Sequence, residues 1–199
     1  MSGSMDGKLL TWGRAVKART GARLPTLWLF TDTLRGGDPI KAARRLPKGL
    51  AGVVFRHDGA SNRAALGREL ARICRARRLS LVVAGDARLA AALGVGMHLR
   101  GGRWPAPLRP RGLTTSSAHG VIELHRARRA GADIIFLSPT FSTKSHPGAP
   151  ELGPARWARL ARTAGEALIF ALGGINGANV RRLPRPQCAG VGAIGALGG

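Results

Sequence analysis

The stretch LIFALGGING, residues 168–177, is an apolar run that ends in two glycines, an isoleucine and an asparagine. A buried strand that ends in bare backbone has two explanations. Either the glycines form a tight turn into the next helix, or they let an anion come close to the main-chain N–H groups. The stretch therefore predicts a buried strand and marks its carboxyl end as a candidate site.

Seven other short runs along the chain also predict strands, and segments with helical periodicity separate them. Most of the runs are continuously apolar, which is typical of parallel strands covered on both faces. The eight predicted strands are residues 26–32, 51–57, 80–86, 95–101, 113–119, 133–141, 168–175 and 189–197. Eight alternations of strand and helix predict an α/β fold, a (β/α)₈ TIM barrel, in preference to an open doubly wound sheet.

The two ends of the chain bear on how this barrel closes. Gly199 follows directly after the eighth predicted strand, so we expect the usual last helix to be missing. Either a helix near residues 9–18 covers the gap, or a second copy of the chain does, which predicts a homodimer. We expect residues 1–25 to be an N-terminal segment with that short helix and residues 26–199 to form a single barrel domain.

Composition narrows the class of protein. The 199 residues are 44% hydrophobic, which is enough for one sizeable core, and no apolar run is long enough to predict a membrane span. The N-terminus lacks the apolar centre of a secretory signal. Cys74 and Cys188 both fall in segments that we expect to be packed, so we predict reduced thiols and a cytoplasmic protein.

The net charge of +22 is the unusual feature of the composition, since Lys and Arg total 32 against 10 Asp and Glu. Such a charge suggests a nucleic-acid surface. However, the cations are spread along the whole chain, and aromatic residues, which stack on bases, make up only 5%. Nucleic acid is therefore not the expected partner, and a basic nucleic-acid-binding module is kept as an alternative.

The carboxyl ends of barrel strands meet at one rim, where active sites lie in this fold. Gly173 and Gly174 end the seventh predicted strand, and Gly192 and Gly195 lie in the eighth. Barrels often bind phosphate at these two strand ends, so the four glycines are candidate phosphate-binding residues. Arg56 ends the second apolar strand, and an arginine in that position favours a bound anion.

The sequence resembles the thiamine phosphate synthase/TenI family from about residue 27 to 197. The segments that carry the resemblance are GVVFRHDG, LVVAGDARLAAALGVGMHL, SSAH, GADIIFLSPTFSTKSHPGAPELGPARW and FALGGINGANV. The resemblance implies a small (β/α)₈ barrel that couples hydroxymethylpyrimidine diphosphate to thiazole phosphate and releases pyrophosphate. The expected partners are therefore small phosphate esters, with thiazole phosphate on the glycine-rich ends of the last two strands.

The resemblance also implies a diphosphate site. In the family an Arg and a Lys after the second strand, and a Mg²⁺ on two Asp side chains, hold the diphosphate. Arg56 matches the Arg, whereas Asp58 stands at the Lys position. Asp86 matches one of the two metal ligands, and the second Asp has no match around residues 101–103. Mg²⁺ would thus lose one of its ligands, and Arg103 is a candidate to supply positive charge directly.

Further matches lie after the fifth and sixth strands. With these, the implied catalytic residues are Arg56, Lys144, His146 and His119, and the implied substrate-binding residues are Ser117, Thr143 and Ser145 beside the four glycines. A TenI-like thiazole tautomerase is an alternative, but its general-base His is Pro139 here, so His119 or His146 would take its place. A relative that binds phosphate ligands without catalysis is a further alternative.

Overall fold

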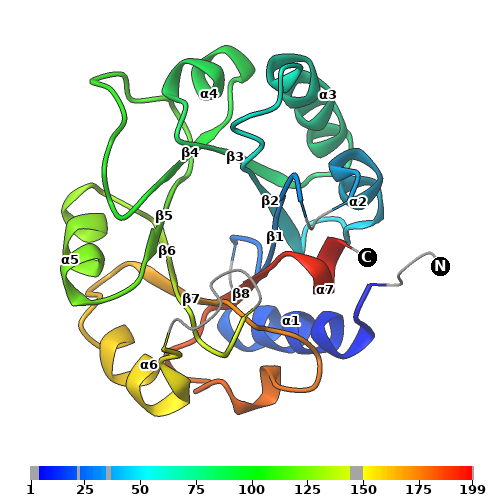
Figure 1. Cartoon of the computed structure of the whole chain (residues 1–199). Coiled ribbons are helices and arrows are strands. Elements are labelled where there is room, and N and C mark those ends of the chain that lie inside the picture. The colour runs from blue at the N-terminus through cyan, green and yellow to red at the C-terminus, as the bar shows by residue number, and fades with distance from the viewer. Residues whose placement is uncertain (1–4, 22, 35–36, 144–149, 199) are drawn as a thin grey trace.

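The computed structural model describes residues 5–21, 23–34, 37–143 and 150–198. Its eight parallel strands close into a barrel in chain order, with β8 beside β1 and helices around the outside (Figure 1). The strands are β1 (Leu27–Phe30), β2 (Ala51–Phe55), β3 (Ser80–Ala84), β4 (Gly96–Leu99), β5 (Thr114–Ala118), β6 (Ile134–Leu137), β7 (Leu168–Leu172) and β8 (Gly190–Ala193). The predicted (β/α)₈ barrel is confirmed.

Helices separate most successive strands, one helix precedes β1, a short one follows β8, and β4 and β5 are joined without a helix. They are α1 (Gly7–Thr20), α2 (Pro39–Arg45), α3 (Arg63–Ala76), α4 (Ala87–Leu93), α5 (Val121–Arg129), α6 (Gly153–Ala161) and α7 (Gly195–Gly198), with a 3₁₀ turn η1 (Val180–Arg182) after β7. None of the described helices is both long and apolar enough to cross a lipid bilayer.

Aromatic and branched side chains fill the barrel. Trp28, Phe30, Phe136 and Phe170 form an interior cluster in which ring centroids lie 4.8–5.9 Å apart. A second, larger cluster lies between the strands and the surrounding helices. Both faces of the sheet are therefore buried, which explains why most of the strands are apolar rather than alternating; β5, with two threonines and two serines, is an exception.

The eighth strand is shorter than predicted. It ends at Ala193, and the glycine-rich residues Gly195–Gly198 form the short helix α7, which contacts β1 and α2. On the neighbouring side α1 contacts β8 and η1 (Figure 1). Its Leu9, Trp12 and Val16 belong to the larger hydrophobic cluster. The expected N-terminal helix thus covers part of the barrel. The homodimer and the domain boundary at residue 25 stay predictions.

Asp6 connects α1 to the carboxyl rim of the barrel. Its carboxylate caps α1 by accepting hydrogen bonds from the backbone N–H groups of Lys8 and Leu9, at 3.0 and 3.2 Å. The same carboxylate accepts from the Gly177 N–H at 2.6 Å, and the Asp6 N–H donates to the Ala196 carbonyl at 3.2 Å. One residue therefore contacts both the loop after β7, through its side chain, and the start of α7, through its backbone.

Candidate active site

A cavity of about 850 Å³ opens at the carboxyl ends of the strands, a size that suits a small-molecule ligand. The sequence-predicted residues that line it are Arg56, Arg103, Ser117, His119, Thr143, Gly173, Gly174, Gly192 and Gly195. Asp86 is not among the lining residues. Lys144, Ser145 and His146 lie outside the described residues, so their proposed roles stay predictions.

Packing requires glycine at three of the four predicted positions. Gly173 and Gly174 have φ values of +92° and +67°, in the left-handed region that favours glycine. A Cβ on Gly174 would lie 2.3 Å from the Ser142 carbonyl oxygen, and one on Gly192 would lie 2.7 Å from the Phe30 ring. A tight turn and close packing therefore explain these glycines without any ligand.

Gly195 is different, because nothing lies within 4 Å of the position that its Cβ would take, although the residue lines the cavity. It begins α7, so its N–H is one of the unsatisfied donors of a helix start. Among the described residues, the N–H groups of Gly173, Gly174 and Gly195 have no hydrogen-bond acceptor. The tight turn is therefore confirmed, and the approach of an anion to these N–H groups stays a prediction.

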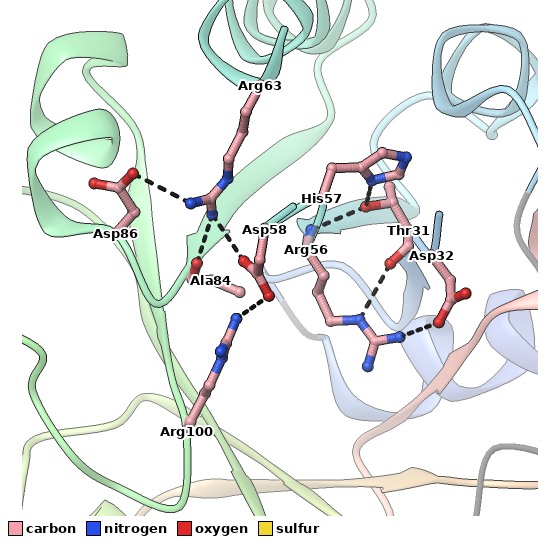
Figure 2. A network of polar contacts seen from close by, with 9 residues as sticks. All are labelled: Thr31, Asp32, Arg56, His57, Asp58, Arg63, Ala84, Asp86 and Arg100. Carbon is pink, nitrogen blue, oxygen red and sulfur yellow. Dashed lines mark hydrogen bonds and ion pairs between the residues drawn. The ribbon is translucent and has the colours of Figure 1, made fainter. Parts of the chain in front are cut away.

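Arginines line the opposite side of the cavity. The Arg56 guanidinium pairs with the Asp32 carboxylate at 2.8 Å and donates from Nε to the Thr31 carbonyl at 3.1 Å (Figure 2). The Phe30 ring lies 5.6 Å from its Cζ atom. These contacts fix the direction of the Arg56 side chain at the end of β2. The other lining arginines are Arg100, Arg103 and Arg126.

A second ion-pair cluster lies beside this wall. The Arg63 guanidinium contacts Asp58 at 3.1 Å and Asp86 at 3.2 Å, and it donates to the Ala84 carbonyl at 2.8 Å (Figure 2). Asp58 also pairs with Arg100. The other oxygen of Asp86 caps α4 by accepting from the Leu89 N–H at 2.9 Å. Asp86 therefore has both of its oxygens engaged by the protein.

His119 is oriented by a carboxylate that sequence reasoning did not identify. Its Nδ1 atom lies 2.9 Å from Glu123 Oε2, and its backbone N–H donates to the same oxygen at 2.8 Å. Burial alone would raise the pKa of Glu123, but the hydrogen bonds from His119 and the charges of His119 and Arg126 lower it below the ordinary value. The four-residue spacing at the start of α5 was the available signal.

The two other rim histidines are buried and bound to threonines. His98 Nδ1 lies 2.8 Å from Thr115 Oγ1, and His57 Nδ1 lies 3.0 Å from Thr31 Oγ1. Burial lowers the pKa of both, that of His98 to about 3. His98 is therefore neutral near pH 7, and His119 is the lining histidine that is accessible for proton transfer.

A sequence profile described as "Thiamine monophosphate synthase" matches residues 31–197 of the chain. The chain belongs to this family. A thiamine-phosphate synthase from Geobacillus kaustophilus is 34% identical over 144 residues, which are 69% of this chain and 65% of that protein. One from Parasynechococcus marenigrum is 32% identical over 81% of this chain and 48% of its own length. The chain thus spans about half to two thirds of these two relatives.

A solved structure has the same fold as this chain. A thiamine phosphate pyrophosphorylase from Pyrococcus furiosus superimposes with a TM-score of 0.74 at 22% identity, covering 89% of each chain. At that identity the likeness establishes the barrel alone.

The Mg²⁺ that the thiamine monophosphate synthase family implies does not fit the arrangement of the carboxylates in the described part of the chain. Mg²⁺ requires oxygen ligands in near-octahedral geometry, usually carboxylates together with phosphate oxygens. Here the guanidinium of Arg63 lies between Asp58 and Asp86, where a cation shared by the two carboxylates would sit. Among the described residues no three His, Cys, Asp or Glu side chains form a metal-binding group.

Proposed function

We propose that this chain is a thiamine phosphate synthase. It would couple hydroxymethylpyrimidine diphosphate to thiazole phosphate and release pyrophosphate. The observation that supports the proposal is one cavity with two chemically different sides, arginines after β2 and β4 and free N–H donors at Gly173, Gly174 and Gly195. A reaction between a diphosphate and a monophosphate needs two such anion-binding sides at either end of one site.

The proposed reaction breaks the bond between the pyrimidine methylene carbon and the diphosphate oxygen. The electron pair of that bond leaves with pyrophosphate, and the pyrimidine ring stabilises the positive charge that remains on the methylene carbon. The lone pair of the thiazole nitrogen then forms the new C–N bond, and the thiazole becomes a cationic thiazolium. Rate enhancement would come from positioning the two substrates and from stabilising the departing negative charge.

The chain's residues divide between the two substrates in this proposal. Arg56, fixed by Asp32 and Thr31, would bind the diphosphate, with Lys144 and His146 as further predicted ligands. The N–H groups at Gly174 and Gly195 would bind the thiazole phosphate. The His119–Glu123 pair lies beside Gly101 and Arg126. We therefore propose that His119, oriented by Glu123, donates a proton to the leaving pyrophosphate.

Mixing the two substrates with the purified chain tests the proposal. We expect equimolar thiamine phosphate and pyrophosphate by chromatography, and a loss of kcat/KM of at least roughly tenfold in Arg56→Gln. Arg72→Gln, on the exposed face of α3, is the matched control because it removes the same charge away from the cavity. Absence of product at saturating substrate contradicts the proposal.

The alternatives give different outcomes in the same preparation. Isomerisation of a thiazole phosphate without coupling would identify a tautomerase, and phosphate binding without any product would identify a binding protein. Salt-sensitive binding of DNA or RNA would favour the nucleic-acid module. The homodimer and the cytoplasmic location stay predictions, and size-exclusion chromatography with light scattering tests the first of them.

A further inference from the structure

The segment after β4 forms a tight turn with an arginine on either side. Arg100 and Arg103 form an isolated antiparallel bridge, with the Arg103 N–H donating to the Arg100 carbonyl at 3.1 Å. Gly101 and Gly102 between them have φ values of +55° and +72°. Positive φ at both central residues is the requirement of a type I′ turn, in which the flanking residues pair directly. Both flanking arginines line the cavity.

Contacts with α5 fix this turn in place. A Cβ on Gly102 would lie 2.4 Å from the backbone nitrogen of Ala127, so the turn packs directly on the helix. The Gly102 N–H donates to Ser116 Oγ at 3.0 Å, and Arg126 donates to the Gly101 carbonyl at 3.2 Å. The bases of the Arg100 and Arg103 side chains are therefore held at the cavity edge by defined backbone geometry rather than by an open loop.

The two arginines have different surroundings. The Arg100 guanidinium pairs with Asp58 and lies over Gly85, where a Cβ would come within 3.1 Å of its Cζ atom. Glycine at position 85 thus leaves the space that Arg100 occupies. The guanidinium of Arg103 is exposed and has no hydrogen-bond or ion-pair partner among the described residues. Arg103 is therefore available to bind an anion directly.

The carboxylates around the cavity are already engaged. Arg63 pairs with Asp58 and Asp86, Arg56 pairs with Asp32, and the lining carboxylate Glu123 binds His119. A divalent cation would have to compete with an arginine for the paired oxygens of Asp32, Asp58 or Asp86, and with His119 for Glu123 Oε2. A phosphate group would meet arginines whose planar guanidinium groups match two phosphate oxygens at once.

We propose that this side of the cavity binds a diphosphate group without a divalent cation, with Arg103 as a direct ligand and Arg100 beside it. The inference rests on the proposed function in that the diphosphate is the one the synthase reaction would use. In this arrangement the charges of the turn arginines take the part that a metal ion would otherwise have, which is to offset the negative charge of the leaving pyrophosphate.

Calorimetric titration of the intact chain with inorganic pyrophosphate in excess EDTA tests this inference. We expect binding in EDTA that added MgCl₂ tightens by no more than about threefold. Arg103→Gln should weaken the binding roughly tenfold, because a charge-assisted bidentate contact is lost. The control Arg72→Gln should change it by less than about twofold.

Two results would overturn the inference: pyrophosphate binding that is seen only with Mg²⁺ or not at all, or equal affinities of Arg103→Gln and Arg72→Gln. Parallel assays of thiamine phosphate formation in EDTA separate this inference from the proposed function. Product that requires Mg²⁺ contradicts the metal-free site and leaves the synthase function standing. Metal-free pyrophosphate binding that depends on Arg103, without any product, supports the metal-free site and contradicts the synthase function.

Discussion

The Arg63 guanidinium lies 3.2 Å from the Asp86 carboxylate, and both side chains are largely shielded from solvent, with exposed fractions of 16% and 34%. The family resemblance assigns Asp86 to a metal ion, yet the structure gives it two structural roles. One oxygen caps α4 and the other pairs with Arg63. Asp86, which matches one of the two metal ligands of the family, therefore stabilises the rim and does not line the cavity.

Substitutions of Asp86 distinguish these roles. Asp86→Ala should lower the free energy of unfolding by about 1–2 kcal/mol, because it removes a helix cap and a partly buried ion pair. Asp86→Asn keeps a capping oxygen and should lower the free energy of unfolding by less than about 1 kcal/mol. Asp38→Ala is the control, since Asp38 caps α2 without an ion pair among the described residues. Urea denaturation provides the measurement.

The same variants carry a functional readout. Asp86→Asn should leave the pyrophosphate affinity in EDTA within about twofold of the unmodified chain, because Asp86 does not line the cavity. If Asp86→Asn instead abolishes a Mg²⁺-dependent activity while remaining folded, Asp86 is a metal ligand and our assignment is wrong.

Substitution of two glycines at the cavity should affect different properties, the stability of the fold at Gly174 and phosphate binding at Gly195. Gly174→Ala should destabilise the fold by about 1–3 kcal/mol, because φ is +67° and the new Cβ would lie 2.3 Å from the Ser142 carbonyl oxygen. Gly195→Asp should leave the thermal midpoint nearly unchanged, since the space beside Gly195 is open. Its carboxylate should nevertheless repel a phosphate group from the nearby N–H donors.

Binding of thiazole phosphate, followed by calorimetry, checks the second half of this prediction. Gly195→Asp should weaken binding by at least roughly tenfold, while Gly195→Ala should change it by only a fewfold because Ala adds no charge. Equal binding by Gly195→Asp and the unmodified chain would show that the monophosphate lies elsewhere.

Acid should destabilise the fold through His98. Burial holds the pKa of folded His98 at about 3, against 6.5 for an exposed histidine, so between these values the unfolded state binds more protons than the folded state. The free energy of unfolding should therefore fall as the pH decreases below about 6.5, and His98 should account for roughly 1–2 kcal/mol of that loss at pH 5. His98→Asn should lose that contribution.

Urea denaturation at pH 7.5 and pH 5 measures this effect. His125→Asn is the control, because it removes a histidine that is exposed on α5. Burial lowers the pKa of His57 in the same direction, so part of the acid sensitivity should remain in His98→Asn. An identical pH dependence in His98→Asn and His125→Asn would contradict the prediction.

The barrel was predictable from the sequence because its signal is local and repeated. Continuous apolar runs such as residues 51–55 and 168–172 mark strands buried on both faces, and eight of them with helical segments between leave few topologies. The glycine pair at 173–174 was also recognisable as a strand end. The end of the eighth strand was not, since apolar and glycine residues at 194–198 suit either a strand or a short helix.

The ion pairs of the site were less accessible to sequence reasoning. That Arg63 reaches Asp58 and Asp86 depends on side-chain directions from α3 and the loops after β2 and β3, which no spacing rule specifies. The arginine turn did carry a signal, because two adjacent glycines favour a type I′ turn. The i,i+4 spacing of His119 and Glu123 was a further signal that went unused.

The central claim is that one cavity at the carboxyl rim holds a monophosphate and a diphosphate on opposite sides. A crystal structure of the chain with thiamine phosphate and pyrophosphate bound together tests it most directly. We predict the ester phosphate beside the N–H groups of Gly174 and Gly195, and pyrophosphate against Arg103 and Arg56. Both ligands at other surfaces, or the phosphate groups on the reverse sides, would contradict the account.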